Sequence, residues 1–271
     1  MVNNDDMQKN PFLNDSQIKE KAPSVFAEKP SEEVSKHYTH IPTTKVINDM
    51  RSLGWDVVDV QEVKARTKAT RGVQKHLVVF RNPDVVINGD DGDTVFPQVL
   101  LTNSHDGKNA FQFQAGLYRL VCSNGLVIAD TQFEAVKMRH MGYTFEDLQV
   151  KIKEMVEKLP LTVESMNKMK ETELGQKQAV EFAKKALNTR FTKDEIKRVK
   201  IDLNELLIPV RNEDAGNDLW SIFNVVQEKI ITGDFEYVAA GKVRKAREIK
   251  NFKQDQKINK ELFDLALEYA S

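Results

Sequence analysis

The sequence predicts an α+β fold, in which strands and helices occupy separate stretches of the chain. Alternation of apolar and polar residues, which is typical of strands, runs from about residue 56 to about residue 140. Apolar residues at helical spacing occur just before this stretch and again from residue 145 onward. This segregation favours a mainly antiparallel sheet of five to six strands, preceded by one helix and followed by a helical C-terminal region.

Three regions follow from this order of elements. Residues 1–40 are polar and contain three prolines, which predicts an extended N-terminal arm. Residues 41–160 form the predicted α+β sheet domain, and residues 161–271 form a helical region packed on or beside the sheet. The boundary lies at Pro160 because a proline is expected to stop the helix that begins near residue 145.

The individual elements are read from local patterns. The first helix is expected to begin with Thr43 as its N-cap and to end at Gly54, since glycine commonly follows the last helical turn. A strand at 56–64, a basic loop at 65–72 and a strand at 73–80 then predict a β-hairpin. Further strands are expected at 94–102, 110–118, 126–129 and 135–140. Further helices are expected at 145–158, 172–190, 217–231 and 258–269, and residues 192–208 are expected to be helical in part.

Composition narrows the class of protein. The chain has 271 residues, of which 40% are hydrophobic and 30% charged, so it is long and apolar enough to bury a core. No stretch approaches the roughly 20 apolar residues that a transmembrane helix requires, so no membrane partner is expected. The start of the chain lacks the features of a secretory signal. A single cysteine, Cys122, excludes a disulfide scaffold and favours a reducing compartment.

The distribution of charge is more informative than its sum of −1. No acidic residue occurs between Lys64 and Arg81, and a second basic run extends from Lys242 to Lys253. A hairpin loop rich in lysine and arginine can follow a phosphate backbone, and aromatic side chains that stack on bases often accompany it. Trp55, Phe80, Phe111, Phe113 and Tyr118 are possible stacking residues. The alternative is a solvated hairpin beside core aromatics. The predicted nucleic-acid-binding residues are Lys64, Arg66, Lys68, Arg71, Lys75, Arg119 and Arg139.

A second group of polar residues falls at predicted turns and strand ends. Histidine beside aspartate can act as a base or a metal ligand, which would suit a metal-dependent nuclease. The alternative is ordinary turn chemistry with a buried structural cysteine. The sequence has no phosphate-binding loop, dinucleotide-binding, zinc-protease or serine-hydrolase motif. No catalytic residue, metal or cofactor is therefore assigned. The candidate polar site consists of His76, Asn103, His105, Asp106, Cys122, Asn124 and His140.

Several short motifs are spread along the chain from residue 22 onward. They are Ala22–Phe26, Tyr38–Thr43, Gly54–Trp55, Lys75–His76, Leu101–Gly107, Gly116–Leu126, Arg139–His140, Asp218–Trp220 and Asn224–Glu228. Together they resemble a family of phage- and plasmid-encoded proteins of unknown function, over residues 22 to about 270. The resemblance implies a mobile-element origin, the cytoplasm of a bacterial host and no established activity.

A looser resemblance concerns the order of elements. The chain is expected to contain a helix, then Gly54–Trp55, then a basic hairpin and meander. This order is similar to the core of single-strand annealing recombinases, which form rings that hold DNA in a basic groove. This resemblance implies a non-enzymatic homo-oligomer that binds or anneals single-stranded DNA in phage or plasmid recombination or replication. Two alternatives stay open: a metal-dependent nuclease, and a host-directed interaction protein that inhibits a defence system.

Overall fold

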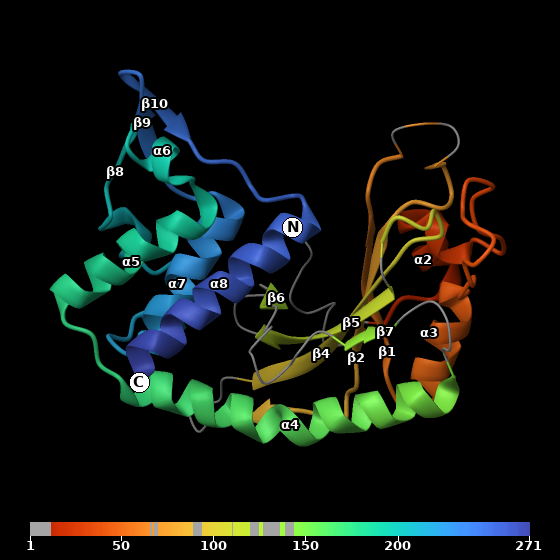
Figure 1. Cartoon of the computed structure of the whole chain (residues 1–271). Helices are drawn as coiled ribbons and strands as arrows, with labels where there is room; N and C mark the ends of the chain where they lie inside the picture. Colours follow the sequence, from red (N-terminus) through yellow and green to blue (C-terminus); the bar gives the residue numbers. More distant parts are fainter. Residues whose placement is uncertain are drawn as a thin grey trace. The chain divides into compact units, whose positions relative to one another are not determined.

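The computed structural model combines helices and sheets, as the sequence predicts (Figure 1). It describes residues 12–65, 67, 70–88, 94–109, 111–119, 125–126, 136–138 and 144–271. The chain divides into two compact units. Unit 1 comprises Met1–Leu120 and Thr131–Glu157, and unit 2 comprises Val121–Asp130 and Lys158–Ser271.

Unit 1 is built on an antiparallel sheet of four long strands. These are β1 (Asp56–Glu62), β2 (His76–Arg81), β4 (Thr94–Asn103) and β5 (Phe111–Arg119), which are labelled in Figure 1 and paired in the order β1-β2-β4-β5. Two short strands, β3 (Ile87–Asn88) and β7 (Val136–Met138), pair with β4 and β5. A further strand, β6 (Gly125–Leu126), has two residues. The predicted hairpin is confirmed, because β1 and β2 are antiparallel partners with Glu62 opposite His76.

The N-terminal region differs from the extended arm that the sequence predicts. Residues Asp15–Lys21 form helix α2, in which Asn14 accepts a hydrogen bond from the Gln17 amide and the Gln17 side chain accepts one from the Asn14 amide. A short 3₁₀-helix, η1 (Pro23–Phe26), follows. Ile18 and Val25 are fully buried, and Leu13 donates a backbone hydrogen bond to Val57 at 2.7 Å. Polar composition concealed these few buried apolar residues, which are sufficient to fix the segment on β1.

Helix α3 (Thr43–Ser52) supplies much of the core of unit 1. Val46, Ile47 and Met50 point inward, and Gly54 follows the helix with a φ of 82°, as the sequence predicts. Strand β2 is buried along its whole length, which places it at the centre of the unit. This central strand begins at His76, so the chemistry of that residue operates in a fully enclosed environment.

Helix α4 (Phe145–Glu171) continues through Pro160, and the prediction that it stops there is wrong. Proline in a helix interior costs about 3 kcal/mol. The buried positions continue at helical spacing on both sides of it, and each buried apolar side chain contributes about 1.5–3 kcal/mol. These positions are Leu148, Ile152, Met155, Thr162, Met166 and Met169. The division between the two units falls inside α4, between Glu157 and Lys158.

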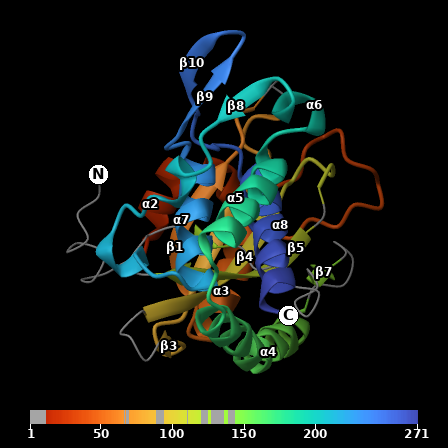
Figure 2. The same cartoon turned by 90° about the vertical axis from the view of Figure 1, so that its left-hand side faces the viewer.

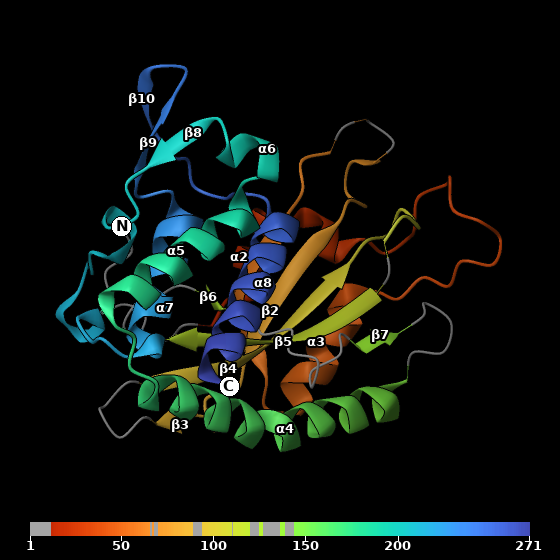
Figure 3. The same ribbon diagram turned by 60° about the vertical axis from the view of Figure 1, so that its left-hand side comes forward.

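Unit 2 packs helices around a buried central helix, α7 (Leu219–Thr232). Asp218 caps the start of α7 by accepting the Ser221 amide, and Gly233 ends it with a φ of 74°. Helices α5 (Gln176–Arg190) and α8 (Phe252–Ala270) pack against α7, as Figures 2 and 3 show. The remaining elements are α6 (Lys193–Ile196) and the 3₁₀ turns η3 (Glu205–Leu207) and η4 (Asn212–Asp214).

Unit 2 also contains a second sheet, which the prediction of a single sheet and a helical C-terminal region missed. Its strands are β8 (Val199–Ile201), β9 (Glu236–Ala239) and β10 (Lys242–Lys245), in the antiparallel order β10-β9-β8. Strands of three or four residues are too short to show a convincing alternation in sequence. Figures 1 and 2 show β9 and β10 as a hairpin that extends beyond the helices of this unit.

No helix in the described ranges has both the length and the apolarity needed to cross a membrane.

Candidate functional site

The connection between β1 and β2, residues 63–75, carries the first set of candidate residues. Lys64 and Arg71 are exposed, and neither forms an ion pair with another described residue. Lys75 is half-buried. Arg66, Lys68 and Arg139 lie outside the described residues, as does the side chain of Arg119, whose backbone ends β5.

Four of the five aromatic residues proposed to stack on bases are buried. Trp55 is 3% exposed, and Phe80, Phe111 and Phe113 are completely buried, so the stacking prediction is wrong for these four. The side chain of Tyr118 lies outside the described residues. Alternation places Phe111 and Phe113 on one face of a strand, but it does not show whether that face is covered or exposed. Unit 1 can therefore offer charge to a ligand through the hairpin, without these aromatic surfaces.

Short hydrogen bonds close the base of this hairpin. The Val63 amide donates to the Lys75 carbonyl at 2.9 Å, and Gln74 Nε2 donates to Glu62 Oε1 at 2.8 Å. The Gly72 amide in turn donates to Gln74 Oε1 at 2.6 Å. The two arms that carry Lys64 and Arg71 are thus joined just below the charged positions.

Beneath the hairpin lies a set of polar side chains with no exposed surface, which we call the buried polar cluster (Ser24, Thr43, His76, Asn103 and His105). Its centre is the Thr43 hydroxyl. Thr43 Oγ1 lies 2.8 Å from His76 Nε2, 3.0 Å from Asn103 Nδ2 and 3.3 Å from His105 Nε2. Buried polar groups are costly unless they are hydrogen-bonded. This one hydroxyl satisfies three of them.

The network assigns the protons on the two histidine rings. His76 Nδ1 lies 3.1 Å from the Gln74 carbonyl and 3.1 Å from Ser24 Oγ, so Nδ1 carries the proton and Nε2 accepts from Thr43. Thr43 has a single hydroxyl proton, which it donates to Nε2 of His76. The hydroxyl oxygen must then accept from Asn103 and from Nε2–H of His105. Ser24 Oγ completes the chain by donating to Glu62 Oε2 at 2.8 Å.

Burial keeps His76 neutral. It lowers the pKa of His76 from 6.5 to about 4, and the hydrogen bond to the Gln74 carbonyl opposes this shift only in part. A protonated ring would also lose the lone pair on Nε2 that accepts the Thr43 hydroxyl proton. Desolvation and the hydrogen bond from Thr43 therefore favour the same uncharged state at neutral pH.

Thr43 does not play the role that the sequence predicts for it. The N-cap of α3 is Pro42, which makes no side-chain capping bond, and Thr43 is the first residue within the helix. Its hydroxyl is used by the buried polar cluster instead of the helix terminus. Tertiary contacts to β2 and to the end of β4 have replaced local capping, and this exchange is invisible to a local sequence pattern.

In the turn after β4, Asp106 makes the hydrogen bonds that the turn-chemistry alternative describes. The Asp106 carboxylate accepts hydrogen bonds from Ser104 Oγ at 2.8 Å and from the Lys108 amide at 3.0 Å. Tyr38 donates its hydroxyl proton to the Ser104 carbonyl at 3.0 Å. Burial, with the nearby charge of Asp106 as a second cause, raises the pKa of Tyr38 to about 12.

The structure brings together part of the predicted polar site. His76, Asn103 and His105 meet in the buried polar cluster, and Asp106 holds the adjacent turn. Cys122, Asn124 and His140 lie outside the described residues. Sequence reasoning missed Ser24 and Thr43. Both occur within the short motifs that carry the family resemblance, which was the available signal.

The buried polar cluster is placed to hold structure together. All five side chains are enclosed, and their hydrogen bonds connect η1, α3, β2 and the end of β4. The ring of His40 lies 4.7 Å from that of His105, which lies 5.2 Å from that of His76. Even so, no group of three or more His, Cys, Asp or Glu side chains among the described residues could hold a metal ion.

Comparison with known proteins identifies the family. Residues 30–263 match the family described as Domain of unknown function (DUF932). The chain belongs to this family. Two relatives from Escherichia coli (strain K12), UPF0380 protein YafZ and UPF0380 protein YfjQ, are each 29% identical to it over 245 residues, which is 90% of this chain and 86% of the relative. No solved structure matches the chain. The DUF932 range includes four of the five residues of the buried polar cluster, all except Ser24.

Proposed function

We propose that the protein binds nucleic acid through the basic connection between β1 and β2. The observation that carries the proposal is the combination of exposed, unpaired cations with a fixed base. Lys64 and Arg71 are exposed and have no ion-pair partner among the described residues, while the strands below them are closed by hydrogen bonds. A cation held in this way neutralises a phosphate without giving up an existing ion pair.

The binding proposed here is electrostatic. Lysine and arginine displace the counterions of a phosphate backbone, so affinity arises from ion release and falls with salt. The other cations of the predicted surface, Arg66, Lys68, Lys75, Arg119 and Arg139, would extend the same contact. The setting we propose is single-stranded DNA binding or annealing during phage or plasmid recombination or replication. The protein would act in the bacterial cytoplasm, as a homo-oligomer, without a covalent step.

The test is a titration of a fluorescein-labelled single-stranded oligothymidine, followed by anisotropy at several salt concentrations. Replacing both Lys64 and Arg71 by Glu is expected to weaken binding about tenfold or more at low salt. The slope of log K against log salt should fall by about 1.4, since each single-strand phosphate contact contributes about 0.7.

The matched control reverses two other cations of unit 1, the half-buried Lys151 and the exposed Lys153 of α4. Lys151 and Lys153 form ion pairs with Glu154 and Glu157 on the same helix. The Lys151→Glu, Lys153→Glu variant makes the same change in net charge and should bind oligothymidine much as the wild type does. If both double variants weaken binding equally, total charge and not the hairpin governs the interaction, and the proposed site is wrong.

A further inference from the structure

The three-stranded sheet of unit 2 gathers cations from two distant stretches of the chain. Arg198 and Lys200 lie beside and within β8, and Lys242, Arg244 and Lys245 lie on β10. All five are exposed. Only the second group is visible as a basic run in the sequence. Pairing of both β8 and β10 with β9 brings the two groups into one sheet.

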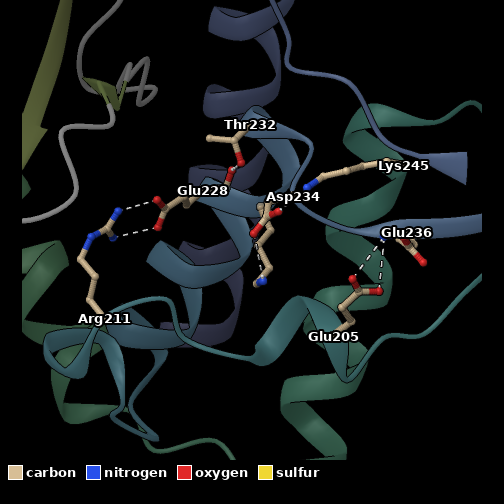
Figure 4. A network of polar contacts seen from close by, with 8 residues as sticks. Glu205, Arg211, Glu228, Thr232, Asp234, Glu236 and Lys245 are labelled. Atoms are coloured by element: carbon tan, nitrogen blue, oxygen red, sulfur yellow. Dashed lines mark hydrogen bonds and ion pairs between the residues drawn. The ribbon is translucent and has the colours of Figure 1, made fainter. Parts of the chain in front are cut away.

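Ion pairs divide these cations into two kinds. Lys245 pairs with Asp234 at 3.0 Å (Figure 4). The buried Lys229 approaches the same carboxylate at 3.8 Å. Lys242 and Arg244, which lie closer to the turn of the hairpin, make no ion pair with any described residue. Lys245 therefore helps to anchor the hairpin, while the two cations beyond it remain available to a ligand.

Polar contacts hold the base of the hairpin to the helices, as Figure 4 shows. The Glu236 amide donates to both carboxylate oxygens of Glu205 at 3.3 Å. The Arg190 guanidinium donates to the carbonyls of Ile230 and Arg247, which lie in α7 and just after β10. A ligand at Lys242 and Arg244 would therefore meet a hairpin whose base is already ordered, which lowers the entropy lost on binding.

An aromatic side chain shares a face with the two available cations. Directly opposite residues of antiparallel strands point to the same side of a sheet, and Arg244 is paired with Tyr237 in the register of β9 and β10. Lys242, two residues away, points to the same side. The Tyr237 ring is half-buried and lies edge-to-face against Phe191 at 5.9 Å. Cations beside a partly exposed aromatic ring are the combination that single-strand binding uses.

We propose that this surface, the Tyr237 face (Tyr237, Lys242 and Arg244), binds single-stranded nucleic acid. Lys242 and Arg244 hold backbone phosphates, and Tyr237 stacks on a base. This inference rests on the proposed function, because the Tyr237 face and the β1–β2 connection would bind the same single-stranded polymer. It adds the stacking contact that the buried aromatics of unit 1 cannot provide.

The first experiment reverses the two cations in the full-length chain. The Lys242→Glu, Arg244→Glu variant is expected to bind fluorescein-labelled oligothymidine about tenfold more weakly, with a salt slope smaller by about 1.4. The control is Lys177→Glu with Lys184→Glu, which reverses two exposed cations of α5 that make no ion pair within the described ranges. Because all four side chains are exposed, neither double variant should alter folding. Circular dichroism checks this.

The second experiment separates stacking from charge. Tyr237→Phe keeps the ring and should bind normally, whereas Tyr237→Leu should bind oligothymidine several-fold to about tenfold more weakly. An abasic deoxyribose-phosphate oligomer of the same length tests the base itself. The wild type should prefer oligothymidine to the abasic oligomer, and Tyr237→Leu should lose most of this preference. Equal wild-type affinity for the two polymers would overturn the assignment of Tyr237.

Failure of this inference can be told apart from failure of the hairpin proposal. If Lys64→Glu with Arg71→Glu weakens binding while Lys242→Glu with Arg244→Glu does not, the Tyr237 face is wrong and the hairpin stands. The reverse result would support the Tyr237 face and overturn the hairpin. If the wild type does not bind oligothymidine even at low salt, both proposals are wrong.

Discussion

Each unit presents a basic β-hairpin, but the two hairpins are held by different kinds of chemistry. The β1–β2 hairpin stands mainly on buried hydrogen bonds between uncharged groups, in which one threonine hydroxyl serves two histidines and an asparagine. The half-buried Glu62 carboxylate accepts from Ser24 and Gln74 beside them. The β9–β10 hairpin is held mainly by charged groups near the surface, such as Asp234 with Lys245. Enclosed hydrogen bonds resist salt but fail if one partner is lost, whereas surface ion pairs are weakened by salt and tolerate replacement. The two hairpins should therefore respond differently to mutation and pH.

The largest effect is expected from Thr43→Val, which keeps the shape of the side chain and removes its hydroxyl. His76, Asn103 and His105 would each lose the bond to Thr43 in an enclosed site. The free energy of unfolding should fall by about 2–4 kcal/mol, measured by urea denaturation. Thr44→Val, at the neighbouring half-buried position, is the control and should change stability by less than about 0.5 kcal/mol. Similar losses for both variants would mean that the Thr43 hydroxyl in the buried polar cluster contributes no more to the free energy of unfolding than an ordinary half-buried hydroxyl does.

Acid is expected to weaken unit 1 through His76. Its pKa is about 4 in the folded chain against an ordinary value of 6.5, so between these values the unfolded chain binds a proton that the folded chain does not. The contribution of His76 to stability is complete above pH 6.5 and is lost as the pH falls to 4. The slope is about 1.4 kcal/mol per pH unit, or about 3 kcal/mol in all.

Hydrogen exchange of the β2 amides at pH 7 and pH 5 measures this dependence within unit 1. His76→Gln should make it smaller, while His37→Gln, at an exposed position, should leave it unchanged. A wild-type pH dependence that survives in His76→Gln would assign the effect to another group.

Acid should act in the opposite direction on Asp255 in unit 2. Burial raises the pKa of Asp255 from 3.8 to about 6, and the hydrogen bond from Asn259 lowers it only in part. The folded chain therefore holds the proton more tightly, and this contribution to stability is present below pH 3.8 and lost as the pH rises through 6. Asp255→Asn keeps an oxygen that accepts from Asn259 and removes the buried charge.

This substitution is expected to stabilise the protein by about 1–2 kcal/mol at pH 8, with little effect at pH 4, as measured by urea denaturation at the two values. Asp264→Asn is the comparison, because Asp264 is paired with Lys260 at 3.0 Å and is more exposed. It should produce no gain. Stabilisation by Asp255→Asn that is equal at both pH values would rule out ionisation as its cause.

The smallest effect concerns the turn between β9 and β10. Ala240 and Gly241 both have positive φ, of 51° and 74°, a conformation that asparagine and glycine tolerate better than alanine. Ala240→Asn should raise the free energy of unfolding by about 0.5 kcal/mol. Gly241→Ala should lower it by about 1 kcal/mol, although open space surrounds that glycine. Thermal unfolding of the two variants tests the sign, and a gain from Gly241→Ala would contradict the turn conformation.

Sequence reasoning succeeded where the structure is decided locally. The helix that ends before Gly54 and the β1–β2 hairpin follow from patterns within a few residues, and both are present. The buried polar cluster could not be predicted in the same way, because Thr43 and His105 are 62 positions apart. Thr43 lies in the Tyr38–Thr43 motif, which is part of the family resemblance, but the motif does not show which groups its hydroxyl contacts.

The sequence did not predict the second sheet or the continuation of α4 past Pro160, and the two errors have a related cause. Strand β8 is stabilised as a strand by pairing with β9, which lies more than 30 residues later in the chain. Pro160 is a strong local signal for a helix end, yet burial on both sides of it outweighs that signal. Local propensity was overruled where long-range packing supplied more free energy than the local rule.

The bond from Leu13 to Val57 has a consequence for solubility. Strand β1 is the last in the order of its sheet, so one of its edges could pair with a strand from another molecule and begin aggregation. The Leu13 amide occupies the Val57 carbonyl on that strand, Arg51 donates to the Leu13 carbonyl at 3.4 Å, and the register of β1 shifts between Val57 and Asp59. Leu13, which precedes the N-cap Asn14 of α2, thus shields this edge from pairing, and a chain shortened to begin at Asn14 should precipitate more readily than the full-length protein.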